Sequence, residues 1–305
     1  MKGQKIHGII PPMVTPLKNQ DELDVAGLKK LIDHIIEGGV HGLFILGTTG
    51  EAQSLSYHLR YELVDRTIQQ VNGRVPVLVG ISDTSLVESL NLAIHAKQCG
   101  ANAVVATPPY YYMPNQNELF NYYLSLAENS PLPLFLYNMP SHTKVNISVE
   151  TVVNLSDHEN IIGLKDSSGN LLYFQEMVRA LKRNEEFSVL IGPEEMLMQS
   201  ILTGGHGGVN GGANMFPKLY VKMYEASVKR EMDLMVELQE IILEISSNIY
   251  TIGNSGGGYL PGLKTSLSQL GICENFMALP YAAYGSNEKR EIQKKIDSMD
   301  LEEWI

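Results

Sequence analysis

The sequence of 305 residues is poor in cysteine and lacks long apolar stretches. Its two cysteines, Cys99 and Cys273, are far apart and match no metal-binding or redox spacing, so we expect both to be ordinary buried thiols. No run of 18 apolar residues occurs, and a membrane-spanning helix is therefore not expected. The first residues, MKGQKIHGIIPPMVTP, have neither the apolar core nor the cleavage site of a signal peptide, which favours a cytoplasmic protein.

Positive charge is also scarce. The chain has 23 Lys and Arg residues against 34 Asp and Glu residues, a formal net charge of −11 at pH 7. A basic surface of the kind that binds nucleic acid is therefore not expected. Hydrophobic residues make up 44% of the chain, which is enough for a substantial core. Both observations fit a soluble globular protein that binds neither nucleic acid nor membranes.

The sequence does contain a regular alternation of short apolar runs with longer segments of helical periodicity. Eight apolar runs predict strands, at residues 8–14, 42–47, 75–80, 103–108, 133–138, 161–166, 188–192 and 207–212. Eight strands separated by helices predict an α/β fold of the (β/α)8 TIM-barrel type. A doubly wound sheet is disfavoured because residues 15–20, TPLKNQ, hold no glycine-rich phosphate loop.

The strand pattern ends near residue 230. Leu234, Leu238, Ile241 and Ile245 then have the spacing of a long amphipathic helix. We expect a catalytic barrel over residues 1–230 and a C-terminal helical extension over residues 231–305, packed on the barrel. The stretch SGGGYLPGLK (255–264) lacks the Gly-Lys-Ser/Thr ending of a phosphate loop and is expected to be a bend between helices.

A lysine interrupts the apolar run IIGLKDSSG (161–169), at the carboxyl end of a predicted strand. Barrel enzymes carry their active sites at these strand ends. Burial would lower the pKa of Lys165 and free its amine to attack a carbonyl carbon. Alternatively, Lys165 is a strand-end lysine paired with Asp166. The spacing alone leaves both interpretations open.

Two neighbouring strand ends carry hydroxyl groups. Tyr137 ends the preceding strand, and its phenol is either a proton-transfer group or a packing residue. Thr48 and Thr49 lie between Gly47 and Gly50 in a turn rich in hydrogen-bond donors. Such a turn suits a substrate carboxylate, although a simple strand-to-helix connection explains it equally well.

Together, GTTGE (47–51), YNMP (137–140) and IIGLKDSSG (161–169) resemble the pyruvate-dependent class I aldolases typified by dihydrodipicolinate synthase and N-acetylneuraminate lyase. The similarity extends from about residue 6 to the late 260s. It implies a TIM barrel that assembles as a homotetramer, a dimer of dimers, and that acts on small molecules. It also implies that no metal or organic cofactor is required.

The resemblance further implies a role for each matching residue. Lys165 would form an imine with pyruvate or another 2-keto acid, and Tyr137 and Thr48 would move the proton. Tyr111 would reach into the site of a neighbouring subunit and join that relay. The substrate carboxylate would be held by Thr48, Thr49 and Gly50.

At the positions expected to contact the second substrate, this sequence differs from well-known members of the family. His142 stands where dihydrodipicolinate synthases carry an arginine that binds a carboxylate, which weakens an assignment to lysine biosynthesis. Glu194 and Glu195, in GPEE, align with residues that bind sugar hydroxyls in sialic acid lyases, although acids at a helix start are also favoured electrostatically. Further substrate contacts are expected from Ser167, Gly192 and Asn210.

The eighth predicted strand ends in two glycines, Gly211 and Gly212, where sialic acid lyases carry a serine and a threonine. They either open space for a substrate or allow chains to pack closely. From all these features we expect a Schiff-base-forming lyase or aldolase acting on pyruvate or a 2-keto-3-deoxy sugar acid. The alternatives are 4-hydroxy-tetrahydrodipicolinate synthase, which condenses pyruvate with aspartate semialdehyde, and a non-catalytic keto-acid-binding protein.

Overall fold

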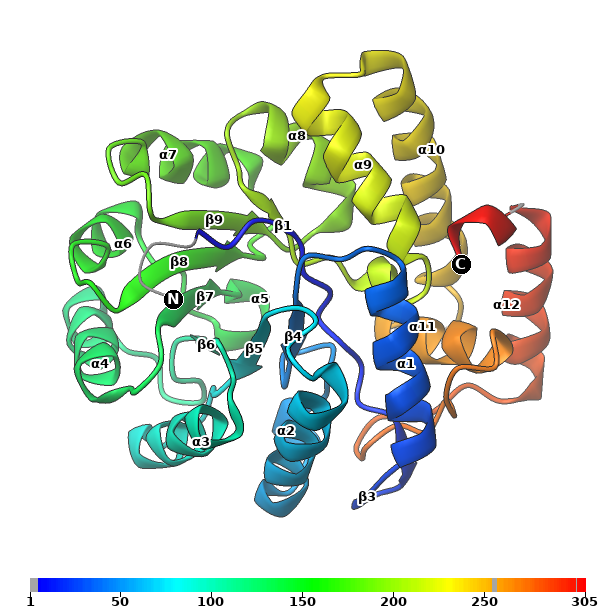
Figure 1. Ribbon diagram of the computed structural model, residues 1–305, viewed down its shortest axis with the longest axis horizontal. Coiled ribbons are helices and arrows are strands. Elements are labelled where there is room, and N and C mark those ends of the chain that lie inside the picture. Colours follow the sequence, from blue (N-terminus) through cyan, green and yellow to red (C-terminus); the bar gives the residue numbers. More distant parts are fainter. Residues whose placement is uncertain (1–4, 254–256, 300) are drawn as a thin grey trace.

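The computed structural model describes residues 5–253, 257–299 and 301–305, and its centre is a barrel of parallel strands (Figure 1). Hydrogen bonds join the strands in the order β1-β10-β9-β8-β7-β6-β5-β4. Phe44 closes the ring, because its N–H donates to the Pro11 carbonyl at 3.0 Å and its carbonyl accepts from the Met13 N–H at 2.8 Å. The predicted (β/α)8 barrel is confirmed, with strands Gly8–Ile9 (β1), Leu43–Ile45 (β4), Val77–Gly80 (β5), Ala103–Ala106 (β6), Leu134–Asn138 (β7), Ile161–Asp166 (β8), Ser188–Ile191 (β9) and Gly207–Gly208 (β10).

Two of these strands are shorter than the sequence predicts. β1 ends at Ile9 because Pro11 and Pro12 have no N–H group to donate to a ladder. β10 ends at Gly208, and Gly211–Asn214 form a short 3-10 helix. A small antiparallel hairpin of Leu17–Asn19 (β2) and Glu22–Leu23 (β3), which the sequence analysis missed, precedes the first helix.

Helices surround the barrel because each has an apolar stripe facing the strands. The helix α1, for example, buries Leu28, Leu31, Ile32 and Ile35. The helices of the barrel are Val25–Glu37 (α1), Tyr57–Val71 (α2), Leu86–Cys99 (α3), Gln116–Asn129 (α4), Pro140–Thr143 (α5), Val149–Leu155 (α6), Leu171–Leu181 (α7), Leu197–Leu202 (α8) and Pro217–Lys229 (α9).

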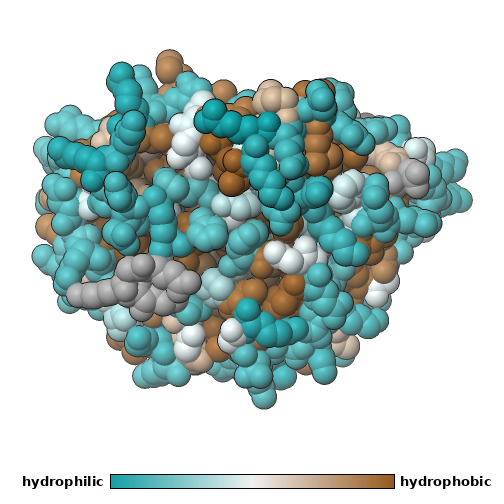
Figure 2. All heavy atoms as spheres, turned by 45° about the horizontal axis from the view of Figure 1, so that its top comes forward, coloured by the Kyte–Doolittle hydropathy of each residue, from teal (hydrophilic) through white to brown (hydrophobic). Residues whose placement is uncertain are grey.

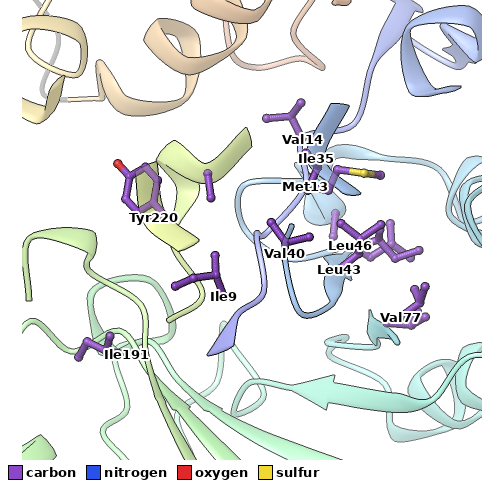
Figure 3. Close-up of a cluster of buried hydrophobic side chains, with 14 of the residues drawn as sticks. Ile9, Met13, Val14, Ile35, Val40, Leu43, Leu46, Val77, Ile191 and Tyr220 are labelled. Atoms are coloured by element: carbon purple, nitrogen blue, oxygen red, sulfur yellow. The ribbon is translucent and has the colours of Figure 1, made fainter. Parts of the chain in front are cut away.

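The strands separate two hydrophobic cores. Because successive side chains point to opposite faces of a strand, Leu134 and Leu136 of β7 pack outward, whereas Phe135 and Tyr137 point into the barrel. The outer core lies between strands and helices, and Figure 3 shows part of it around Ile9, Leu43 and Val77. The inner core fills the barrel itself with Ile6, Ile10, Phe44, Leu78, Ala103, Val105, Phe135, Tyr137, Leu190 and Val209.

Three further helices follow the barrel: Met232–Ile249 (α10), Tyr259–Gln269 (α11) and Ser286–Ser298 (α12). They gather on one side of the barrel, beside α9 and α1 (Figure 1). The long helix predicted after residue 230 is present as α10. The expected bend at 255–264 is wrong for its second half, since residues 259–264 are helical, and residues 254–256 lie outside the described residues. The division at residue 230 stays a prediction.

The surface is mainly polar. Figure 2 shows one face on which hydrophilic residues predominate and hydrophobic residues appear in small groups. Within the described part of the chain, no helix has the length and apolar character needed to cross a membrane. Cys273 is buried as expected, but the same expectation is wrong for Cys99, which is only partly buried because it is the last residue of α3, near the surface.

Candidate active site

A cavity of about 260 Å³ opens at the carboxyl ends of the barrel strands. A larger hollow of about 720 Å³ lies at the opposite end, where β8 begins at Ile161, and Lys165 is not among the described residues that line it. The smaller cavity therefore holds the candidate chemistry. It is lined by Pro12, Thr48, Thr49, Tyr137, Met139, His142, Lys165, Ser167, Gly192, Pro193, Glu194, Glu195, Val209, Gly211, Tyr250 and Tyr259.

Strand alternation places the lysine inside the barrel. Lys165 lies on β8 opposite Tyr137 of β7 in the parallel ladder, and its side chain is only 5% exposed. Its Nζ is 4.0 Å from the centroid of the Tyr137 ring and 5.0 Å from that of Phe44. Burial lowers the pKa of Lys165 from 10.5, against the opposing effect of the Tyr137 hydroxyl. The ammonium of Lys165 therefore loses its proton more easily than that of an exposed lysine.

Asp166 does not pair with Lys165, because it faces the other side of the strand. Its Oδ1 accepts hydrogen bonds from the Asn138 amide and from the Ser168 N–H, both at 3.0 Å. Asn138 in turn accepts from the Ile147 N–H at 3.0 Å. This buried network fixes the ends of β7 and β8 beside each other, so it positions Tyr137 and Lys165. Spacing alone did not reveal it.

Tyr137 belongs to a hydroxyl network. Its phenol oxygen lies 3.3 Å from Thr48 Oγ1 and also interacts with Lys165 and Ser167. Burial opposes ionisation of the phenol, but the Lys165 charge and these hydrogen bonds together lower the pKa of Tyr137 below 10.0. A phenol of this kind can give and take a proton at the carbon or oxygen atoms of a ligand bound to Lys165.

Residues of the C-terminal helices complete the cavity wall. Thr49 Oγ1 lies 3.1 Å from the Tyr259 hydroxyl, and the rings of Tyr250 and Tyr259 pack edge to face at 4.9 Å. Neither tyrosine could be predicted from the sequence, since no motif marks them. A Cβ atom on Gly211 would collide with the Tyr259 hydroxyl, and one on Gly212 with the Tyr220 hydroxyl. The two glycines therefore allow close packing rather than opening space for a substrate.

The two glutamates of GPEE lie at the cavity but are held by protein groups. Glu194 Oε1 accepts from the Tyr220 and Tyr250 hydroxyls at 2.6 and 2.9 Å, and Oε2 accepts from the Gly212 N–H at 2.7 Å. Burial and the nearby Glu195 charge raise the pKa of Glu194 to about 7, despite these donors. Glu195 Oε1 accepts from the Ser246 hydroxyl at 2.7 Å. At Glu194 Oε1, which already accepts two hydrogen bonds, a substrate hydroxyl would have to replace a protein partner.

A buried ion pair holds the GTTGE turn (47–51) against α11. Lys264 of α11 donates to Glu51 Oε1 at 2.6 Å and to the Thr15 carbonyl at 2.9 Å. Both side chains are fully buried, and Glu51 Oε2 accepts from the Ala278 N–H at 2.8 Å. Glu51 has a positive φ of 56°, which turns the chain directly after Thr48 and Thr49. Lys264 was not recognised in the sequence, because its partner lies 213 positions away.

The structure brings most of the predicted residues to one cavity. His142 lies in α5 at the cavity mouth, largely exposed, with its Nδ1 2.9 Å from the Ser141 hydroxyl. Partial loss of hydration on the cavity side, together with the Lys144 charge, lowers its pKa. Ser167 and Gly192 line the wall.

Three predicted residues lie outside the cavity wall. The Gly50 carbonyl accepts from the Thr15 hydroxyl at 2.7 Å, below the turn. Asn210 lies behind the wall and donates to the Gly192 carbonyl at 3.0 Å. Tyr111 is 99% exposed on the surface, so it takes no part in this chain's own cavity. The roles of all three stay predictions.

The sequence and the architecture are similar to those of known proteins. The model of the dihydrodipicolinate synthetase family matches residues 5–299. The solved structure of dihydrodipicolinate synthase from Bacteroides thetaiotaomicron is 53% identical, with a TM-score of 0.94 over 96% of this chain and 98% of that one. A prophage protein of the same family from Escherichia coli K12, solved with pyruvate, is 28% identical, with a TM-score of 0.91 over 97% of this chain and 99% of that one.

Another relative is named as an aldolase and not as a synthase. The "Probable 2-dehydro-3-deoxy-D-pentonate aldolase YjhH" of Escherichia coli K12 is 32% identical over 94% of this chain and 95% of its own length. The family match covers nearly the whole sequence, and the solved structures above share the barrel. The chain belongs to the dihydrodipicolinate synthetase family.

Proposed function

We propose that this protein is a class I aldolase or lyase that forms a lysine imine with pyruvate or with a 2-keto-3-deoxy sugar acid. The observation that supports this most strongly is the buried amine of Lys165, 4.0 Å from the ring centroid of Tyr137, at the bottom of a cavity lined by hydroxyl groups. The family membership and the relative solved with pyruvate support the same substrate class.

The chemistry uses only groups of the chain and the substrate. The free amine of Lys165 attacks the keto carbon, and the resulting carbinolamine loses water to give a protonated imine. The cation withdraws electrons from the neighbouring carbon, which loses a proton to give an enamine. The enamine attacks an aldehyde carbon, or forms when the same bond breaks in the reverse reaction. Water then hydrolyses the imine, so no organic cofactor or metal is needed for these steps.

The hydroxyl groups around the amine have matching roles. Tyr137 exchanges the protons of carbinolamine formation and of bond making or breaking, and Thr48, 3.3 Å away, passes them on. Thr48 and Thr49 bind the substrate carboxylate. Tyr111, exposed here, contributes from a neighbouring subunit to the same relay, so we propose a homotetramer built as a dimer of dimers.

His142 supports a hydroxylated aldehyde as the partner of pyruvate. Its pKa is lowered from 6.5, which disfavours the charged form, and a neutral imidazole binds a carboxylate more weakly than an arginine does. A neutral imidazole can still donate to or accept from a sugar hydroxyl. This residue favours a sugar-derived 2-keto-3-deoxy acid over aspartate semialdehyde.

The second candidate is 4-hydroxy-tetrahydrodipicolinate synthase. It is favoured by the 53% identical relative, which is named a dihydrodipicolinate synthase. The two candidates share every step at Lys165 and differ only in the second substrate.

A panel of substrates tests the proposal. Purified protein is assayed for condensation of pyruvate with aspartate semialdehyde, and for cleavage of N-acetylneuraminate and of 2-keto-3-deoxy-gluconate, with Lys165→Met as the blank. We expect cleavage of a 2-keto-3-deoxy acid to have the higher kcat/KM. Efficient condensation with aspartate semialdehyde would favour the second candidate, and no turnover with any of the three would count against both.

A further inference from the structure

A second group of chemically reactive side chains lies on the outside of the barrel. Asp65 comes from α2, and His95 and Cys99 come from α3. One donor atom of each residue lies within 4.8 Å of the others. These two helices pack side by side outside the strands (Figure 1). The group has no part in the reaction proposed above, because Cys99 ends its helix four residues before β6 begins, at the end of the barrel opposite the cavity.

The three donor atoms converge on one point. His95 Nε2 lies 2.7 Å from Asp65 Oδ1, Cys99 Sγ lies 3.0 Å from the same oxygen, and Sγ lies 3.5 Å from Nε2. Because His95 and Cys99 are four residues apart, they share one face of α3. The convergence is therefore built by the helix repeat and by the packing of α2 on α3.

From this geometry we propose a zinc-binding site formed by Asp65, His95 and Cys99. Zinc binds thiolate, imidazole and carboxylate donors at about 2.0 to 2.3 Å, in a tetrahedral arrangement. Those bond lengths place a sulfur and a nitrogen ligand roughly 3.5 Å apart, which is the separation of Cys99 Sγ from His95 Nε2. The carboxylate oxygen must move outward by roughly 0.7 Å, and Asp65 is free to do so because its side chain is 55% exposed.

The surroundings favour a cation. Cys99 is the last residue of α3, where the carbonyl groups of the helix end carry partial negative charge. The ring of Tyr61 packs on that of His95 with centroids 4.6 Å apart, which limits the orientations of the imidazole. The set of one sulfur, one nitrogen and one oxygen donor suits zinc rather than magnesium or calcium, which prefer oxygen ligands only. Three protein ligands leave a fourth position for water.

The bound ion would join two neighbouring helices by their side chains. A ligand that binds only the folded state adds to its stability by mass action. We therefore expect zinc to raise the unfolding temperature without changing turnover at the cavity.

Cobalt(II) is the probe, since it takes the place of zinc and its bond to a thiolate absorbs in the near ultraviolet. Protein without an affinity tag is treated with a chelator and titrated with cobalt(II). We expect a sulfur-to-cobalt charge-transfer band that saturates at one ion per chain and disappears when zinc is added. A wild-type protein without this band would overturn the proposal.

Substitutions test whether the absorption band comes from cobalt bound by Asp65, His95 and Cys99. Cys99→Ser should abolish it, whereas Cys273→Ala, which removes the other thiol, should keep it. His95→Ala and Asp65→Asn should weaken cobalt binding by at least about tenfold, because even residues that only orient metal ligands contribute that much. Glu62→Gln, on the same helix as Asp65, is the matched control and should bind like the wild type. A band that persists in Cys99→Ser, or affinity unchanged in both His95→Ala and Asp65→Asn, would overturn the site.

Discussion

At the scale of single residues, the reactivity of Lys165 comes from what surrounds it. Lys165 is only 5% exposed, and its amine packs over the rings of Phe44 and Tyr137. Burial lowers its pKa because an ammonium group loses hydration there. Asp166 is next to Lys165 in sequence but turned away by the strand, so its carboxylate does not hold the amine in the charged form.

The pH dependence of imine formation follows from this burial. Only the neutral amine attacks a keto group, so the rate of imine formation with pyruvate rises as pH rises through the pKa of Lys165. Since that pKa is lowered from 10.5, the midpoint of the rise should lie below pH 10.5. Single-turnover trapping with borohydride from pH 6 upward measures it. A midpoint at the value of a free lysine would contradict the account.

Tyr137→Phe tests whether the phenol transfers protons during the reaction. Loss of a general acid or base lowers turnover by about 10² to 10⁴-fold. We expect a fall in kcat of that size, while the variant still forms a borohydride-reducible adduct with pyruvate. Tyr281→Phe is the control, because Tyr281 is 55% exposed and is not among the described residues of the cavity wall. Equal kcat values for Tyr137→Phe and the wild type would remove Tyr137 from the mechanism.

The raised pKa of Glu194 predicts that the stability of the protein depends on pH. Its pKa is raised from 4.5 to about 7 in the folded protein, so folding favours the protonated form. Its contribution to stability is fully present below pH 4.5 and is lost as pH rises through about 7. Relative to Glu194→Gln, the free energy of unfolding of the wild type should fall by about 3 kcal/mol over this range. Urea unfolding at pH 5 and pH 8 measures the difference. Identical pH profiles for the two proteins would contradict the assignment.

At the scale of elements, the strands could be predicted more fully than the contacts between distant segments. Apolar runs located all eight barrel strands, and motifs at three strand ends identified Lys165, Tyr137 and Thr48. Tyr259 and Lys264 were not predicted, because they lie on α11 and meet Thr49 and Glu51 only after folding. The glycines at 211 and 212 were ambiguous for the same reason, since the phenols that occupy the space beside them come from other helices.

The ion pair between Glu51 and Lys264, which connects α11 to the barrel, should contribute strongly to the free energy of unfolding. Lys264→Met leaves a buried carboxylate unpaired, which destabilises a protein by about 3 to 5 kcal/mol. The double variant Glu51→Gln/Lys264→Met should lose less than Lys264→Met alone. Lys229→Met is the control, because Lys229 is exposed and lies 3.8 Å from Glu225 in a surface pair. Chemical unfolding measures all four proteins. Equal losses for Lys264→Met and Lys229→Met would show that the buried pair is not important.

At the scale of the whole molecule, exposed apolar side chains in the loop after β6 fit the proposed assembly. Tyr111, Tyr112 and Met113 are 99%, 84% and 60% exposed, and the non-glycine residue Tyr111 has a φ of 82°. A strained backbone and exposed apolar side chains both raise the free energy of an isolated chain. Contact with another chain would offset this cost. We expect sedimentation to give four times the chain mass of 33.8 kDa.

Mixed assemblies test whether Tyr111 acts across the interface. Tyr111→Phe and Lys165→Met should each have low activity alone. When the two variants are unfolded and refolded together, some sites combine an intact Lys165 with an intact Tyr111 from the other chain. We expect activity to reappear in the mixture. A mixture no more active than its components would place Tyr111 outside the relay.

The central claim is that Lys165 forms a covalent imine with a keto acid. The protein is incubated with pyruvate, reduced with borohydride, digested and examined by mass spectrometry, with Lys165→Met treated in parallel. The account predicts one pyruvate-derived adduct, on the peptide that contains Lys165, and no adduct in the variant. An unmodified Lys165 peptide, or an adduct that persists in Lys165→Met, would contradict it.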